Sequence, residues 1–191
     1  ILGQIMFGMM QGATTSAMNS IIDASSMLKK IRIEKMVFPL EKVLFELVNF
    51  AISLIAVVIV MIYLQVMPTW LMLYLPLLLV YVTVFTAGLG LLLSSLAVFF
   101  RDVIHFWDVI CTMWMYATPI FYPIEMLPDW MLSAMKFNPM WQFITYFRDI
   151  FMWNTAPSLK LNLICLGMAA ITFAVGLFAF RKTEHKFILY V

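Results

Sequence analysis

Long uninterrupted runs of apolar residues dominate the chain, and their lengths match those of membrane-spanning helices. A helix needs about 20 predominantly apolar residues to cross the hydrocarbon core of a bilayer. Four runs meet this requirement, and the last of them stops abruptly at Arg181 and Lys182. They cover residues 47–66, 71–100, 103–122 and 161–180. The pattern therefore predicts four clear crossings.

The first segment, residues 1–26, is a weaker fifth candidate because it is rich in Gly, Ser and Thr. Gly8, Gly12 and Ser16 recur at every fourth position, a pattern of small residues that lets two helices approach closely. We expect this helix to pack against protein rather than lipid. The predicted fold is all-α: a polytopic membrane helical bundle with five transmembrane helices, forming a single domain over residues 1–191.

The positions of Lys and Arg predict the orientation of this bundle. Nine of the twelve lie on one side, in residues 27–45, at Arg101 and in the tail after residue 180. Cytoplasmic loops carry an excess of these residues, so the chain is expected to begin outside and end inside. The sequence starts at Ile1, and no signal peptide precedes an apolar core. We expect a longer protein with one more span upstream.

Composition narrows the class of protein. Hydrophobic residues make up 64% and charged residues 12%, against about 25% charged in soluble domains. A soluble enzyme and a disordered linker are excluded, and the net charge of +2 does not indicate a nucleic-acid partner. Cys111 and Cys165 lie in apolar runs, as buried hydrophobes do. The sequence has neither a phosphate-binding loop nor an H-E-x-x-H motif, so no catalytic residue, metal or cofactor is predicted.

The cytoplasmic segment 27–45 interleaves charges of both signs with apolar residues and has Pro39 near its middle. An ordinary positively charged loop explains its Lys and Arg residues. A docking surface for a cytoplasmic partner explains the interleaved apolar residues as well, and we favour this interpretation. The predicted docking residues are Lys29, Lys30, Arg32, Ile33, Lys35, Phe38 and Pro39.

A short turn at the predicted cytoplasmic border carries Arg101 and Asp102, whose opposite charges can compensate each other there. His105 and Asp108 follow on one helical face. The simplest interpretation is a hydrated helix end. A proton relay or a metal site is the alternative, although one His beside one Asp is a weak metal signal.

Aromatic residues are abundant, with 17 Phe, 7 Tyr and 6 Trp. Most rings in such a chain face lipid or the membrane interface. A minority can line a path, because flat rings stack on sugar faces without requiring one particular hydrogen bond. The candidates for such a path are Trp107, Trp114, Tyr116 and Tyr122.

The external segment 123–157 is neither polar enough for a free loop nor long enough in any run to span. Asn138 and Pro139 are typical of a helix start, with Asn as the cap and Pro at the first helical position. A helix of about 14 residues from there is about 21 Å long, too short to cross. Together with a shorter helix over 129–136, it predicts a re-entrant hairpin in the outer leaflet. Arg148 must find a partner or water there.

Several short motifs closely resemble the permease subunits of polysaccharide-exporting type-2 ABC transporters, which export O-antigen, capsular polysaccharide or teichoic acid. The resemblance covers essentially the whole chain but lacks the family's N-terminal interface helix and first span. The family usually has Pro-Arg-Glu at Pro39-Leu40-Glu41 and Ser at Thr118. The matching landmarks are Leu28-Lys29-Lys30, Val37-Phe38-Pro39, Phe100-Arg101-Asp102-Val103, His105, Thr118-Pro119-Ile120, Tyr122-Pro123, Pro128, Asn138-Pro139, Arg148 and Pro157.

The resemblance implies six spans in the full protein, a homodimer, and two separate ATPase subunits that bind ATP and Mg. Segment 27–45 would then be the coupling elbow seated in the ATPase. A lipid-linked glycan would move outward across the bacterial cytoplasmic (inner) membrane, with membrane lipid around the complex. The external hairpin would form a gate over the exit, with gate residues Pro123, Asn138, Pro139 and Arg148.

Three other interpretations remain open at this point. A type-2 ABC exporter of a drug or lipid would share the fold but should lack the Tyr-Pro and Asn-Pro landmarks. An integral-membrane enzyme acting on lipid-linked sugars would need acidic residues or His clustered at one membrane face, and the sequence shows no such cluster. A passive scaffold explains neither the elbow nor the hairpin.

Overall fold

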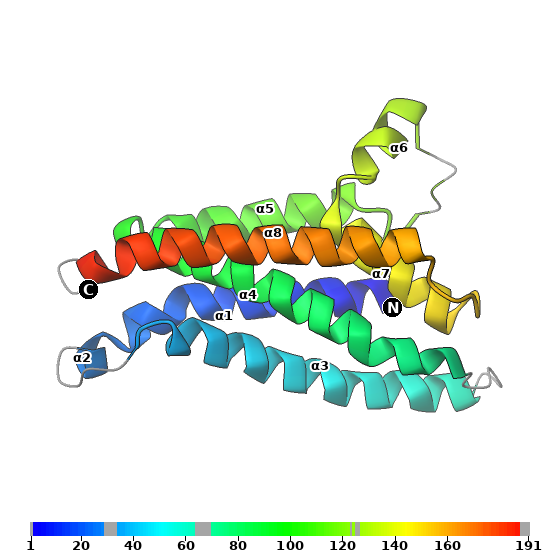
Figure 1. Ribbon diagram of the computed structural model, residues 1–191, viewed down its shortest axis with the longest axis horizontal. Helices are drawn as coiled ribbons and strands as arrows, with labels where there is room; N and C mark the ends of the chain where they lie inside the picture. The colour runs from blue at the N-terminus through cyan, green and yellow to red at the C-terminus, as the bar shows by residue number, and fades with distance from the viewer. Residues whose placement is uncertain (1, 29–33, 64–69, 123, 125–126, 188–191) are drawn as a thin grey trace.

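A computed structural model describes residues 2–28, 34–63, 70–122, 124 and 127–187, and its regular secondary structure is helical throughout these ranges (Figure 1). The elements are α1 (Leu2–Asp23), α2 (Ser25–Leu28), α3 (Val37–Tyr63), the 3-10 helix η1 (Trp70–Tyr74), α4 (Leu75–Phe99), α5 (Val103–Ala117), α6 (Asp129–Met135), α7 (Pro139–Phe151), α8 (Leu159–Thr183) and the 3-10 helix η3 (Glu184–Lys186). The prediction of an all-α bundle is confirmed for the described residues.

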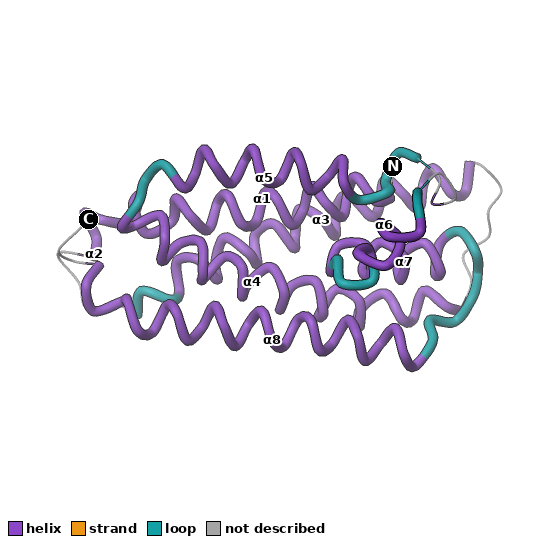
Figure 2. Tube along the Cα trace, turned by 90° about the horizontal axis from the view of Figure 1, so that it is seen from above, coloured by secondary structure: helices purple, strands orange, loops and turns teal. Residues whose placement is uncertain are grey.

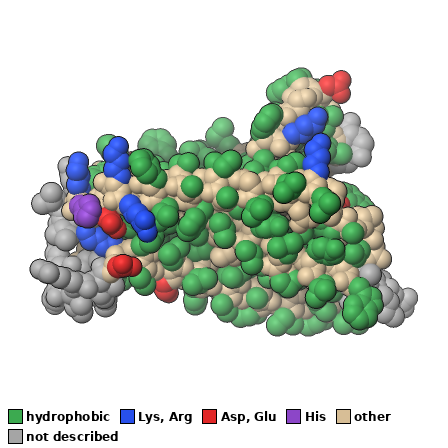
Figure 3. Space-filling model, viewed as in Figure 1, with side chains coloured by type: hydrophobic (Ala, Val, Ile, Leu, Met, Phe, Trp, Pro, Cys, Tyr) green, Lys and Arg blue, Asp and Glu red, His purple; other side chains and the backbone are tan. Residues whose placement is uncertain are grey.

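Five long helices, α1, α3, α4, α5 and α8, lie side by side along the long axis of the molecule (Figures 1 and 2). The C-terminus, α2 and the α4–α5 turn share one end of the bundle, whereas the N-terminus, α6 and α7 lie at the other. Blue Lys and Arg side chains gather at the C-terminal end, and a largely apolar surface separates them from the opposite end (Figure 3). The predicted orientation, with this end in the cytoplasm, stays a prediction.

Among the described residues, three helices are long and apolar enough to cross a membrane: Val37–Tyr63, Trp70–Phe99 and Leu159–Lys186. The predicted span 103–122 is shorter than expected, because α5 ends at Ala117 after 15 residues, about 22 Å. Thr118 is extended ahead of Pro119, as a residue before proline prefers. In the other direction, α3 begins ten residues before the predicted span 47–66, so the second half of the predicted elbow is helical.

Pro39 fits this early start of α3 because it lies in the first turn, where backbone N–H groups have no partner within the helix. The first helix, α1, packs against α3, α4, α5 and α7, as predicted for a helix surrounded by protein. The predicted small-residue contacts are only partly present. A side chain at Gly12 would meet the Glu46 carboxylate at 3.4 Å, whereas one at Gly8 would meet nothing within 4 Å.

The closest helix crossing involves two other glycines. A Cβ added at Gly88 on α4 would lie 2.5 Å from the Cα of Phe173 on α8, and one at Gly176 on α8 would overlap the Gly88 carbonyl. These two helices therefore touch backbone to backbone, an approach that only residues without a side chain permit. The sequence places Gly88 in an apolar run but does not indicate which helix it meets.

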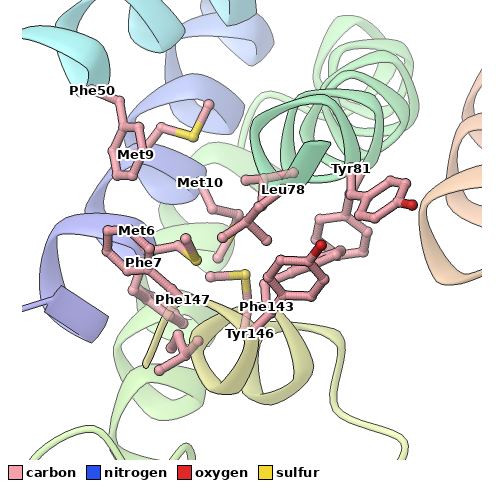
Figure 4. Packing of buried hydrophobic residues seen from close by; sticks show 14 of the residues in the cluster. Met6, Phe7, Met9, Met10, Phe50, Leu78, Tyr81, Phe143, Tyr146 and Phe147 are labelled. Atoms are coloured by element: carbon pink, nitrogen blue, oxygen red, sulfur yellow. The ribbon is translucent and has the colours of Figure 1, made fainter. Parts of the chain in front are cut away.

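The largest apolar cluster lies where α7 enters the bundle (Figure 4). Helix α7 contributes Phe143, Ile144, Tyr146 and Phe147, all with 0% exposure, to a cluster shared with α1 and α4. Tyr146 donates a hydrogen bond to Asn162 Oδ1 on α8 at 2.9 Å. The apolar face of α7 is thus covered by the chain's own helices, whereas α6 projects away from the bundle (Figure 1).

Candidate functional site

The site begins at the external junction, which we define as Thr118, Pro119 and Ile120 after α5 together with Asn138 and Arg148 of the α7 region. Helix α5 stops here because Pro119 has no N–H and disfavours a helical residue before it. The Thr118 N–H still donates to the Trp114 carbonyl at 2.9 Å, and the next turn is tight. The chain then turns away from the helix axis and leaves backbone carbonyls unpaired within α5.

Asn138 joins the start of α7 to the end of α5. Its Oδ1 accepts the N–H groups of Met140 and Trp141 at 3.1 and 3.4 Å, which makes it the predicted helix cap. The same oxygen accepts a hydrogen bond from Trp114 Nε1 at 2.9 Å. The Asn138 amide nitrogen donates to Thr118 Oγ1 at 2.9 Å. The local pattern predicts the cap, but only the fold reveals the bridge to α5.

Arg148 holds the other side of the junction. Its Nη2 donates to the carbonyls of Pro119 and Ile120, both at 3.2 Å. Arg148 is half-buried, and this burial lowers the pKa of its guanidinium, while burial raises the pKa of the neighbouring Asp149 carboxyl. Among the described residues the partners of Arg148 are these carbonyls, not Asp149. Arg148 is therefore anchored within the chain rather than extended toward head groups.

The four aromatic candidates for a path occupy different environments. Trp107 Nε1 donates to Thr14 Oγ1 of α1 at 2.9 Å, and the Trp107 and Trp114 rings meet edge to face at 6.4 Å. Both indoles pack α5 onto α1. Tyr116 is 63% exposed, and the Tyr122 hydroxyl donates to the Tyr116 carbonyl at 3.0 Å. The structure thus places Trp107 in the core with Trp114 half-buried beside it, whereas Tyr116 is exposed and Tyr122 is half-exposed.

A polar stripe runs along α1 and α5, which sequence reasoning largely missed. On α1 it consists of polar side chains spaced at helical intervals and at least partly exposed: Gln4, Gln11, Thr15 and Asn19. His105, Asp108 and Thr112 continue it on α5. Thr15 Oγ1 donates to Asp108 Oδ1 at 3.5 Å, which joins the two halves. The available signal was the repeated polar position within the Gly-rich first segment.

At the cytoplasmic end, the structure describes only part of the predicted elbow. Lys29, Lys30, Arg32 and Ile33 lie outside the described residues, as does Pro123 of the predicted gate. Pro39 is buried and Phe38 is half-buried. Lys35 donates to the Glu184 carbonyl and lies 5.8 Å from the centre of the Phe187 ring.

The predicted membrane-border turn is exposed, and Arg101 and Asp102 form no ion pair with each other. Within the described ranges the single ion pair joins Lys42 and Glu41 at 3.2 Å. Arg101 and Asp102 therefore do not compensate each other's charge by direct contact, because both side chains are exposed at the surface. His105 is exposed as well, and the described residues contain no group of three metal-ligating side chains.

Comparison with known proteins gives two kinds of match to this chain, one to individual permeases and one to a family. O-antigen export system permease proteins RfbA from Klebsiella pneumoniae and Myxococcus xanthus are 31% and 29% identical over 104 residues. The matched stretch is 54% and 52% of this chain, respectively, and 40% of each relative, so it spans less than half of their length. The model of the ABC-2 type transporter family matches residues 1–152, most of the chain. The chain belongs to the ABC-2 type transporter family.

Proposed function

We propose that this chain is the membrane-spanning permease subunit of an ATP-driven exporter that moves a lipid-linked, O-antigen-type polysaccharide outward across the bacterial cytoplasmic membrane. The observation that carries this proposal is the similarity to O-antigen export permeases over 104 residues. The sequence has no phosphate-binding loop, so a separate ABC subunit would bind ATP and Mg and hydrolyse the nucleotide.

Five crossings, formed by α1, α3, α4, α5 and α8, fit this role. These helices run side by side, and Lys and Arg gather where the C-terminus lies (Figures 1 and 3). Helix α5 completes its crossing with the non-helical segment after Ala117. In that segment Arg148 donates to the backbone carbonyls of Pro119 and Ile120, and Asn138 donates to the Thr118 hydroxyl, so these groups are not left to lipid. Helices α6 and α7 then form the external cap.

The polar stripe on α1 and α5 supports a homodimer with the path between the two copies. Polar side chains at membrane depth are costly against lipid and normally face protein or water. Thr15 and Asp108 lie on this stripe, and Gln11 and Thr112 are exposed or half-buried beside them. A second copy facing the stripe would remove it from lipid. The two stripes would then line a hydrophilic route, with Tyr116 and Tyr122 near its external end.

Genetic complementation with a defined cargo tests the proposed function. The protein, expressed with the ATPase encoded beside it, should restore surface O-antigen to a strain that lacks its own export permease. The control is an inactive ATPase whose catalytic carboxylate has been replaced. It should restore no surface O-antigen. Efflux of drugs or lipids without surface polysaccharide would contradict the glycan proposal and favour a drug or lipid exporter of the same fold.

Thiol labelling should reveal the proposed orientation. Lys182→Cys at the exposed end of α8 should react with an impermeant maleimide only after the membrane is opened. Ser133→Cys on α6, also exposed, should react in intact spheroplasts. The background lacks Cys111 and Cys165, which are fully buried. Labelling of position 182 from outside would reverse the assigned orientation.

A further inference from the structure

The proposed coupling elbow is attached to the C-terminal end of the chain by a contact that we call the cytoplasmic brace, made of Lys35, Glu184 and Phe187. Lys35 Nζ donates to the Glu184 carbonyl and lies 5.8 Å from the centre of the Phe187 ring. The two sides of the brace are 149 residues apart in sequence. The brace thus connects the residues just before α3 to the residues just after α8.

Phe187 is built into the core rather than resting on the surface. Its ring has 0% exposure and meets Phe180 of α8 at 5.3 Å and Phe99 of α4 at 6.0 Å, both edge to face. Met36 and Leu40, which follow Lys35 in the elbow, pack against the same cluster. Lys35 therefore binds a C-terminal segment that packs against α4 and α8.

In the described part of the elbow before α3, the side opposite the brace is exposed. Glu34 is exposed and Val37 is 51% exposed, whereas Lys35 and Met36 are partly buried. One side of the elbow thus contacts the permease and the other is available to a cytoplasmic partner. A displacement of the elbow reaches α8 through Lys35, and from α8 it reaches α4 through the glycine crossing at Gly88 and Gly176.

We propose that Lys35 is a positioning residue, which holds the elbow on the C-terminal segment Glu184–Phe187 so that movement of the ATPase is transmitted to α8. This inference rests on the proposed function and adds the C-terminal segment to the coupling machinery. A cation at position 35 contributes twice, because it donates to a carbonyl and attracts the face of an aromatic ring. An ordinary topology-determining charge needs neither contact.

The test uses the assembled transporter and three variants. Lys35→Met removes both contacts, Lys35→Arg retains a cation that can donate and stack, and Lys182→Met removes an exposed cation at the same end of the bundle, outside the elbow and the brace. We expect Lys35→Met to keep permease abundance, ATPase co-purification and ATP hydrolysis but to lower export per ATP roughly two- to ten-fold. Lys35→Arg and Lys182→Met should match wild type. Equal export per ATP in Lys35→Met and Lys182→Met would overturn the proposal.

Two further measurements test the proposal even if a variant does not fold or the cargo has been assigned wrongly. Combining Lys35→Met with Phe187→Leu should be no worse than the worse single variant, since both break one brace, and multiplied losses would contradict it. Spin labels at Val37 and Lys186, both exposed, should give a narrow distance distribution that broadens in Lys35→Met alone. The distance between the two labels can be measured without transport. An error in the cargo assignment therefore leaves it unchanged, whereas an error in the proposed brace does not. An unchanged distribution in Lys35→Met would refute the brace.

Discussion

Replacing Gly176 with alanine should destabilise the permease more than any other single-methyl change in α8. A Cβ at this position would overlap the Gly88 carbonyl of α4, so the two helices would have to separate. Overpacking a fixed contact usually costs about 1–3 kcal/mol. In a chain of this size that lowers the unfolding midpoint by on the order of 2–12 °C. Thermal unfolding in detergent, followed by the fluorescence of the six Trp residues, measures the shift.

Alanine at Gly167 is the matched control for this prediction. Gly167 lies on the same helix, and a Cβ there would meet nothing within 4 Å. Because alanine has the higher helix propensity, Gly167→Ala should leave the midpoint unchanged or raise it slightly. Gly88→Ala should behave like Gly176→Ala, since its Cβ would lie 2.5 Å from the Phe173 backbone. Equal midpoints for the variants at 167 and 176 would show that the α4–α8 contact relaxes without cost.

This glycine contact shows where sequence reasoning stops. A long run of apolar residues predicts a membrane-spanning helix, because the length of the run must match the thickness of the bilayer. Among the described residues, three helices have the required length and composition. The pairing of helices depends on which small residues meet in space. Gly8, Gly88, Gly167 and Gly176 all lie in apolar segments, yet only Gly88 and Gly176 meet each other. The spacing of glycines within one helix carries no information about the partner helix.

Local signals at helix ends were more informative, within their range. Asn138 and Pro139 predict the start of α7 because a cap acts over three or four residues, and the structure has the helix from Pro139. Pro119 carries a similar local signal, and giving it more weight would have ended α5 near Ala117 instead of at residue 122. The contacts of Asn138 with Trp114 and Thr118 cross 24 and 20 residues, which no capping pattern reaches.

In the candidate site, too, the sequence identifies candidate residues, and the fold determines what each of them contacts. Arg148 was identified because a cation in an apolar helix needs a partner, and the partner is a pair of carbonyls at the end of another helix. Trp107 and Trp114 are predicted to line a path because flat rings can stack on sugars, but both rings pack on α1. The sequence prediction misses the polar stripe on α1, because it weighs the small residues of this segment and not the helical spacing of its Gln, Thr and Asn side chains. Contacts across the bundle therefore decide the role of each candidate.

Arg148→Lys should lower polysaccharide export while the permease stays in the membrane at its normal level. The Arg148 guanidinium binds the Pro119 and Ile120 carbonyls, both at 3.2 Å, in a half-buried position. An ammonium is more strongly hydrated than a guanidinium, so lysine gains more by leaving this position for the head groups. The two carbonyls would then lose their donor, and an unsatisfied buried acceptor costs about 1–3 kcal/mol. The external junction should loosen where α5 meets α7.

Surface polysaccharide per unit of permease is the quantity to measure, because it separates transport from abundance. A loss of about 1–3 kcal/mol at the junction corresponds to a population that is roughly five- to hundred-fold smaller for the state in which α5 and α7 are joined at the external junction. Arg148→Met should match or exceed the defect of Arg148→Lys, since it lacks any donor. Lys160→Met, an exposed cation at the start of α8 on the same external side, should export normally. If Arg148→Lys exports as well as wild type, a cation near the head groups suffices, and the carbonyl contacts at Pro119 and Ile120 do not control the external end of the path.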